Sequence, residues 1–225
     1  MIKQMIHQVA ESSPCQFQRL DCPAENIEFY KAGNSNHQRF LVVLDADQLS
    51  TPSELNEKVQ EITPQALQET PSFAKNTDLI LLFRLDSLAK LHQYEHSIFD
   101  IEENAYSLKK HVLYYTTGEL EQLKQYLDLG ESIETLVTNP ELFNHYKHNS
   151  SEETAFSLAC RLYVKLPFLA VPAKESILTS ANQLADQLLS EKKLLVFFNS
   201  IEQQLSAGHG YQDVMEALID EQMAD

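Results

Sequence analysis

Two uninterrupted apolar runs constrain the fold more than any other feature of this chain. Phe40–Leu44 and Leu79–Phe83 contain no polar residue. Neither run alternates with polar positions, which is typical of a strand that is covered on both faces. A segment with helical spacing separates them. We therefore expect neighbouring strands of one sheet, joined by a right-handed crossover.

Three further segments extend this sheet. Val112–Tyr115 is a more polar strand that follows a second helical segment. The resulting alternation of strand and helix favours a largely parallel sheet. Gln16–Leu20 and Ile27–Tyr30 are weaker strands, which we expect to form an antiparallel N-terminal addition. The predicted fold class is α/β, with a mostly parallel sheet and flanking helices, followed by an all-α C-terminal domain.

Capping patterns place the helices. Thr51-Pro52-Ser53-Glu54 is a capping box with Pro at the first helical position, and Thr116 with Glu119 forms a second box. Ser150 with Glu153 predicts another helix start. Apolar residues recur at helical spacing from Leu88 to Ile101, which predicts one helix there.

We expect the chain to be helical after Tyr115, where the last predicted strand ends. We predict an α/β domain in residues 1–130 and a helical domain in residues 131–225. A helix that begins near Leu194 is apolar on nearly all sides at its start, so we expect it to be buried. A last helix is expected over 211–223, with Leu218 and Ile219 on its apolar side.

The charge balance argues against nucleic-acid binding. The chain of 225 residues has 17 Lys and Arg against 33 Asp and Glu, a net charge of -16. Its largest basic clusters are two pairs, Lys109-Lys110 and Lys192-Lys193. Each phosphate contact needs a basic side chain. We therefore predict that the isolated chain does not bind DNA or RNA.

Cysteine usage and hydropathy indicate the compartment. Cys15, Cys22 and Cys160 form no C-x-x-C motif, and their odd number gives no disulfide framework. Free thiols are typical of a reducing cytoplasm. The N-terminus lacks the apolar run of a signal peptide, and no apolar run is long enough to cross a bilayer. We expect a cytoplasmic protein without membrane association.

One short motif resembles a zinc site. His92-Gln93-Tyr94-Glu95-His96 matches H-x-x-E-H, in which two histidines one helical turn apart share a zinc ion and the glutamate acts as base. The third ligand and the downstream glutamate motif are missing. On a helical wheel, Glu95 falls inside the apolar arc and should have a partner.

A second pattern resembles a phosphatase site. Asp45 and Asp47 end the first apolar strand, as in haloacid dehalogenases, where they act as nucleophile and acid/base with Mg²⁺. The later motifs are missing, since the next apolar strand ends in Phe83-Arg84-Leu85-Asp86. We expect no catalytic residues, no metal and no cofactor. A metal-dependent hydrolase that uses either pattern is the alternative.

The segment from Glu102 to Tyr115 combines dense charge with three tyrosines. It is either a solvated helix end that leads into an edge strand, or a polar docking surface. Tyrosines provide contact area with few rotors to freeze, and charged side chains set orientation. The predicted partner-binding residues are Glu102, Glu103, Tyr106, Lys109, Lys110, Tyr114 and Tyr115.

The same segment carries a family resemblance. Residues 77–123 contain the pattern I-x-x-I-E-E-(N/D)-x-Y-x-x-K-K-x-V-L-x-Y-T, which begins at Ile98. This region resembles the middle component of prokaryotic ABC-three component systems, which are Lamassu-like anti-phage or anti-plasmid operons. Leu108 stands where the family often has an aromatic residue, and His111 where it often has Tyr.

This resemblance implies a function without supplying binding residues. A middle component is expected to be a non-catalytic scaffold or adaptor. Its expected partners are an SMC/RecN-like ABC ATPase and a separate effector, often a nuclease. The absence of a complete catalytic motif and the acidic composition agree with such a role.

Overall fold

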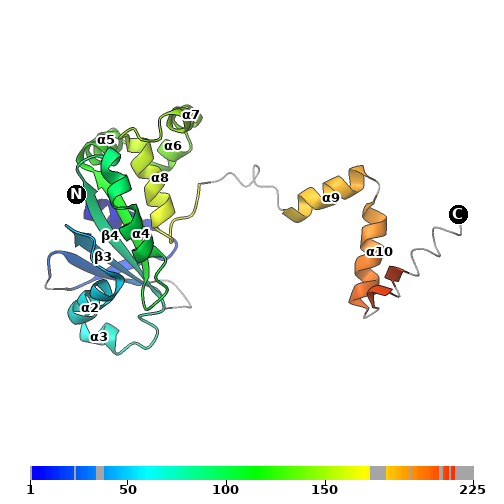
Figure 1. Ribbon diagram of the computed structural model, residues 1–225, viewed down its shortest axis with the longest axis horizontal. Coiled ribbons are helices and arrows are strands. Elements are labelled where there is room, and N and C mark those ends of the chain that lie inside the picture. Colours follow the sequence, from blue (N-terminus) through cyan, green and yellow to red (C-terminus); the bar gives the residue numbers. More distant parts are fainter. Residues whose placement is uncertain are drawn as a thin grey trace, which may run out of the picture. The chain divides into compact units, whose positions relative to one another are not determined.

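The computed structural model describes residues 2–22, 24–33, 38–172, 181–192, 194–207, 210–212 and 214–215. The chain divides into two compact units, Met1–Pro172 and Ala173–Asp225 (Figure 1). The first unit contains the sheet. The second contains the helices α9 (Ala181–Glu191) and α10 (Leu195–Ser206).

The first unit is built on a five-stranded sheet in the order β1-β2-β3-β4-β5. Its strands are β1 (Phe17–Leu20), β2 (Ile27–Ala32), β3 (Phe40–Ala46), β4 (Thr77–Leu85) and β5 (Lys109–Thr116). The two apolar runs are confirmed as β3 and β4, which lie at the centre and pair in parallel. The three weaker strands are confirmed as well, and β5 is parallel to β4.

The prediction of a mostly parallel sheet is wrong, because the sheet is mixed. β1 pairs with β2, and β2 with β3, in antiparallel orientation. The connections over residues 21–26 and 33–39 are too short to hold a crossover helix. A short connection between adjacent strands makes the chain reverse direction, whereas a parallel pair needs a dozen residues or more.

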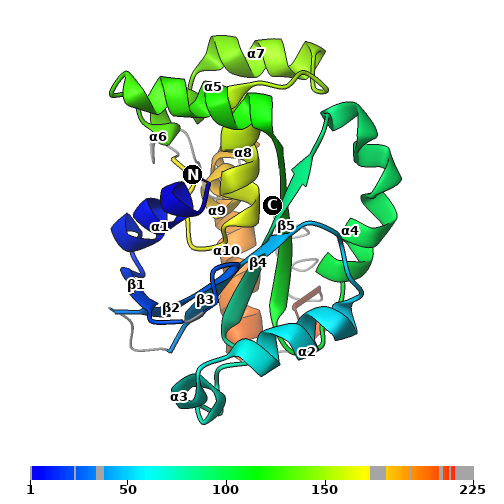
Figure 2. The same ribbon diagram turned by 90° about the vertical axis from the view of Figure 1, so that its left-hand side faces the viewer.

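Helices cover both faces of the sheet. On one face, α2 (Pro52–Ile62) and α4 (Glu95–Glu102) pack on residues such as Val42 and Leu81. On the other, α1 (Ile2–Ser12), α5 (Thr117–Asp128) and α8 (Ala155–Lys165) pack around Leu41, Ile80 and Leu113. Figure 2 shows α1 and α8 opposite α2 and α4. The remaining elements are the helices α3 (Gln65–Gln68), α6 (Ile133–Val137) and α7 (Pro140–His148), and the 3-10 helix η1 (Leu88–Gln93).

Two of the three predicted helix caps are confirmed. Thr51 with Glu54 and Thr116 with Glu119 both form complete capping boxes. The predicted start at Ser150 is wrong, because Thr154 caps α8 by accepting a hydrogen bond from the Ser157 backbone N–H. The Glu153 carboxylate bonds elsewhere. It accepts from Leu88 N (3.0 Å) and from Thr116 Oγ1 (3.0 Å).

The predicted helix over Leu88–Ile101 is in two pieces. The 3-10 helix η1 ends at Gln93, and the α-helix α4 begins at Glu95. The change from three to 3.6 residues per turn shifts the register, so the wheel drawn for one continuous helix does not apply. Glu95 is exposed, and the prediction that it lies in the apolar arc is wrong. Phe99, an apolar residue of the same predicted helix, is 57% exposed.

The C-terminal predictions have mixed outcomes. The start of α10 was expected to be buried, but Val196, Phe197 and Phe198 are exposed in this chain. Tyr211–Gln212 and Val214–Met215 are helical. Leu218 and Ile219 lie outside the described residues. Among the residues that the structure describes, no helix is both long enough and apolar enough to cross a bilayer.

Helices α6, α7 and α8 lie in the first compact unit, although the sequence assigned them to the helical domain. Leu158 and Leu162 of α8 are buried in the same cluster as Leu113 of β5. Compactness does not measure independent folding, so the predicted domain boundary after residue 130 stays a prediction.

Two truncated chains test that boundary. A chain of residues 1–172 should unfold cooperatively in urea, as followed by circular dichroism. A chain of residues 1–130 should aggregate or lack a cooperative transition, because it exposes Leu113 and Leu123, which are 0% exposed beside α8. If the shorter chain unfolds at the same urea midpoint as the longer one, α8 is dispensable and the boundary after residue 130 is correct.

Candidate functional site

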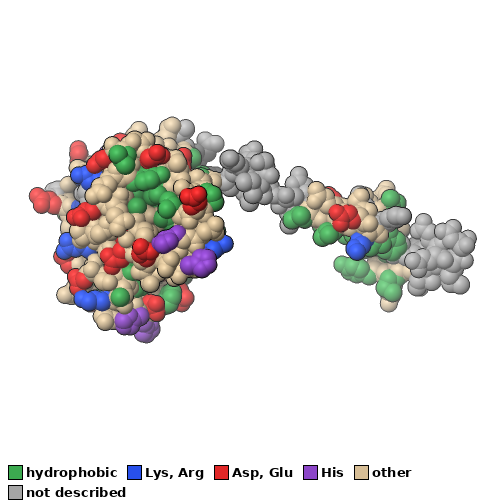
Figure 3. Space-filling model, turned by 90° about the horizontal axis from the view of Figure 1, so that it is seen from above, with side chains coloured by type: hydrophobic (Ala, Val, Ile, Leu, Met, Phe, Trp, Pro, Cys, Tyr) green, Lys and Arg blue, Asp and Glu red, His purple; other side chains and the backbone are tan. Residues whose placement is uncertain are grey.

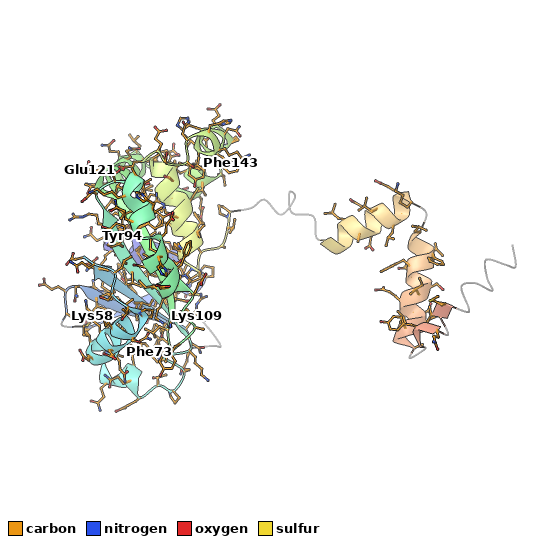
Figure 4. All side chains as sticks on the ribbon, viewed as in Figure 1. Lys58, Phe73, Tyr94, Lys109, Glu121 and Phe143 are labelled. Atoms are coloured by element: carbon orange, nitrogen blue, oxygen red, sulfur yellow. The ribbon has the colours of Figure 1, made fainter. Side chains whose placement is uncertain are left out.

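The predicted docking residues lie along β5 and on the loop that leads into it. β5 is the last strand of the sheet, and Lys109, labelled in Figure 4, opens it. An edge strand presents unpaired backbone N–H and C=O groups that can pair with another chain. The bonds made by the backbone N–H and C=O groups of β5 therefore decide whether another strand can pair with it.

Side chains occupy the free edge of β5 at three alternate residues. Val112 N donates to Glu102 Oε1 (2.8 Å), and Thr116 N donates to Glu119 Oε2 (3.0 Å). Between them, Tyr114 O accepts from Arg161 Nη1 (2.6 Å). Alternate residues direct their backbone groups to the same side of a strand. The edge is thereby capped against addition of a further strand.

The capping side chains are themselves paired. The Lys165 ammonium donates to both oxygens of Glu102, at 2.6 and 2.7 Å. Glu119, which is 0% exposed, forms a salt bridge with Arg161 and accepts from Ser157 Oγ (3.1 Å). We call Glu102, Glu119, Arg161 and Lys165 the edge network. It joins α4, α5 and α8 to β5.

Tyr114 and Tyr115 are half-buried and point to opposite faces of the sheet. The guanidinium of Arg161 lies over the Tyr114 ring, with its central carbon 4.6 Å from the ring centroid. Burial raises the pKa of both phenols. The nearby carboxylate of Asp45 raises the pKa of Tyr115 further. Neither hydroxyl has the lowered pKa that would suit a phenolate nucleophile or base at neutral pH.

Lys110 is a buried cation, 2% exposed. Its ammonium donates to Tyr106 O (2.8 Å), Leu108 O (3.1 Å) and Asn104 Oδ1 (3.1 Å). Three acceptors satisfy the three N–H groups of an ammonium. Burial lowers the pKa of this amine. Lys110 therefore holds the preceding loop from within.

That loop displays the remaining predicted residues. We call residues 103–109 the display loop. Ser107 has a φ of 67°, in the left-handed region that a non-glycine residue enters at a cost of about 1–3 kcal/mol. Tyr106 is 76% exposed, and Glu103 and Lys109 are exposed beside it. The bonds to Lys110 hold the strained backbone that presents these three side chains.

The seven predicted residues thus fall into two groups. Glu103, Tyr106 and Lys109 are exposed on the display loop. The others, Glu102, Lys110, Tyr114 and Tyr115, are buried or half-buried in the sheet edge and its supports. That any of the seven contacts a partner stays a prediction. Arg161 and Lys165 were not predicted from the sequence, because they lie far along the chain from Tyr114 and Glu102, to which they bond.

The two motifs with catalytic potential have other contacts. His92 lies in η1 with Nδ1 2.8 Å from Ala89 O. His96 lies in α4 with Nδ1 3.3 Å from Asp100 Oδ1. Because the helix changes type between them, the two histidines do not have the one-turn α-helical spacing of H-x-x-E-H.

The aspartates after β3 are also separate. Asp45 Oδ2 pairs with Lys3 Nζ at 2.6 Å, and Asp47 is exposed. Within the described ranges, no group of three or more His, Cys, Asp or Glu side chains could hold a metal ion. Neither motif is assembled into a metal centre here.

Comparison with known protein families finds one match, in the region around this site. Residues 39–140 match the family model of the ABC-three component (ABC-3C) system Middle Component 1. The match confirms the resemblance predicted from the sequence. It spans β3 to the start of α7 and includes the display loop and β5. No curated protein and no solved structure matches the chain.

Arg161 offers a test of the edge network. Arg161→Met leaves the carboxylate of Glu119 buried without its cation, and we expect it to lower the free energy of unfolding by about 3–5 kcal/mol. Urea denaturation of the full chain measures this. The control is Lys90→Met, whose pair with Asp86 is exposed to solvent, and it should leave the midpoint unchanged. A similar midpoint for both variants would contradict a structural role for the Glu119–Arg161 pair.

Proposed function

We propose that this protein is a scaffold or adaptor subunit of a bacterial anti-phage or anti-plasmid defence complex of the Lamassu-like kind. It bridges an SMC/RecN-like ABC ATPase and an effector nuclease. The observation that carries the proposal is the match of residues 39–140 to the middle-component family. The matched region holds the central strands of the sheet and the display loop.

The chemistry of the site supports a binding role and not a catalytic one. The carboxylates and cations along β5 neutralise each other and bond to the strand's own backbone. The histidines and aspartates of the two catalytic motifs have separate contacts. No specific observation favours the metal-dependent hydrolase, so we do not propose it.

The display loop fits the requirements of a docking surface. Tyr106 offers a large exposed ring, and tyrosine is enriched at the centres of protein interfaces. Glu103 and Lys109 supply charges of both signs that orient a partner. Because Lys110 already fixes the loop backbone, binding loses little further conformational entropy.

Nucleic-acid contacts belong to the partners in this proposal. With Lys110 buried, the Lys109-Lys110 pair leaves one ammonium on the surface. The other basic pair contains Lys193, which lies outside the described residues. A net charge of -16 repels a polyanion. We place the complex in the cytoplasm, where the free thiols of Cys15, Cys22 and Cys160 remain reduced.

Co-expression with the ATPase and effector of the same operon tests the adaptor role. We expect a stable complex in size-exclusion chromatography. Tyr106→Ala should weaken binding of one partner at least about tenfold, as truncation of a central interface aromatic does. The matched control is Phe143→Ala, which removes a half-exposed ring of α7, labelled in Figure 4. A chain that elutes alone beside both partners at micromolar concentration rules the adaptor role out.

A gel-shift titration with duplex DNA tests the electrostatic expectation. At about 150 mM salt the isolated chain should show no shift at micromolar concentration, because non-specific affinity comes almost wholly from phosphate contacts by Lys and Arg. Sub-micromolar binding that decreases steeply with salt and is lost in Lys109→Glu would contradict this expectation.

A further inference from the structure

A cavity of about 370 Å³ lies beside the display loop, away from the edge network. Its walls come from the second half of α2, from α3 and the turn that follows it, and from Ser107 and Leu108 of the display loop. Phe73, labelled in Figure 4, forms the apolar part of the lining together with Val59 and Leu108. Small-molecule sites have volumes of about 300–1,000 Å³, so the cavity is large enough for a small ligand.

Helical spacing brings the α2 residues of the lining to one wall. Asn56, Val59, Gln60 and Thr63 occupy positions i, i+3, i+4 and i+7, which share one face of a helix. Val59 supplies apolar surface, and the other three supply polar atoms. The wall therefore combines the two kinds of surface that are typical of a ligand site.

The lining of the cavity is uncharged. Charged residues make up 22% of the chain, and Figure 3 shows acidic and basic side chains spread over the first unit. Among the described residues that line the cavity, none is Asp, Glu, Lys, Arg or His. A charged ligand would lose hydration there without gaining an opposite charge, which is unfavourable. The lining therefore selects an uncharged ligand.

Several polar groups of the lining have already donated their protons to the backbone. Gln68 Nε2 donates to Gln60 O (3.1 Å) and Thr63 O (2.8 Å). The Thr63 hydroxyl donates to Val59 O (2.6 Å), and the Thr70 hydroxyl donates to a backbone carbonyl of α3 (3.0 Å). A hydroxyl has one proton to donate, and an amide nitrogen has two. These three side chains can therefore offer a ligand only acceptor oxygens.

Asn56 adds an acceptor that has no donor. Its Oδ1 is buried and accepts no hydrogen bond from any residue that the structure describes. A buried acceptor without a donor destabilises a fold. A turn of the amide about its Cβ–Cγ bond exchanges the positions of oxygen and nitrogen, so the oxygen can face the cavity that Asn56 lines. A ligand N–H or O–H group would supply the missing donor.

We propose that this cavity binds an uncharged small molecule that carries N–H or O–H donors on an apolar ring. Val59, Phe73 and Leu108 contact the ring, and Asn56 accepts a hydrogen bond from the donor. The bound molecule also contacts Ser107, the residue of the display loop with positive φ. This site goes beyond the proposed adaptor function and does not depend on it.

Titration of the ¹⁵N-labelled full chain with benzamide tests the proposal. Benzamide is an uncharged ring with two N–H donors. We expect saturable changes in the backbone amide chemical shifts of Ser107 and Leu108. Two matched probes should each bind at least tenfold more weakly. N,N-dimethylbenzamide has no N–H donor, and benzoate is charged.

Two variants test the location of the site. Asn56→Leu removes the acceptor and should weaken benzamide binding about tenfold. Its urea midpoint should not decrease, because the variant also removes a buried polar atom without a partner. The matched control is Asn144→Leu, the same change at an exposed position of α7, which should bind like the wild type. Ala74→Leu, which fills part of the cavity, should abolish binding of all three probes.

Three results would overturn the proposal. The first is the absence of any saturable shift with benzamide. The second is binding of N,N-dimethylbenzamide or benzoate as tight as that of benzamide. The third is unchanged benzamide affinity in Asn56→Leu or Ala74→Leu. None of these results bears on the adaptor function, which formation of the complex tests separately.

Discussion

The buried pair of Glu119 and Arg161 is the contact on which the first unit depends. It lies where β5 ends and α5 begins, and Arg161 belongs to α8, far along the chain. The same guanidinium reaches the backbone of Tyr114. Glu119 is 0% exposed, and removal of its partner cation would leave a buried charge unpaired, which strongly destabilises a fold. The fold of the sheet edge therefore includes α8, and the compact unit extends to Pro172.

The capped edge also limits how another chain could bind to β5. Glu102, Arg161 and Glu119 bond to backbone groups on the free edge of β5 and so oppose the addition of a further strand there. Next to this edge the display loop presents side chains, so recognition there would depend on side chains and not on the main chain of β5. Recognition through side chains discriminates between partners by shape and charge, whereas strand addition draws most of its affinity from the main chain.

The features that were predicted correctly from the sequence are those that depend on residues close together in the chain. The apolar runs identified β3 and β4, and the capping boxes at Thr51 and Thr116 were correct because a cap involves residues three apart. The sequence also contains a signal for the 3-10 helix. Leu88, Leu91 and Tyr94 recur every third residue, which is the 3-10 period. The density of charge and tyrosine drew attention to residues 102–115. It did not predict that Lys110 is buried, or which distant residues pair with Glu102 and Glu119. Those depend on chain segments brought together only by folding.

Lys110 holds the display loop mainly through hydrogen bonds to backbone atoms. Two of its three acceptors are the carbonyl oxygens of Tyr106 and Leu108, which any residue at those positions provides. The loop conformation is thereby uncoupled from the side chains that it presents. Substitutions at Ala105 and Tyr106 can change the side chains that the loop presents while its backbone shape persists. If the loop binds a partner as we propose, point mutations at its tip would adapt the protein to a diverged partner without changing the fold beneath it.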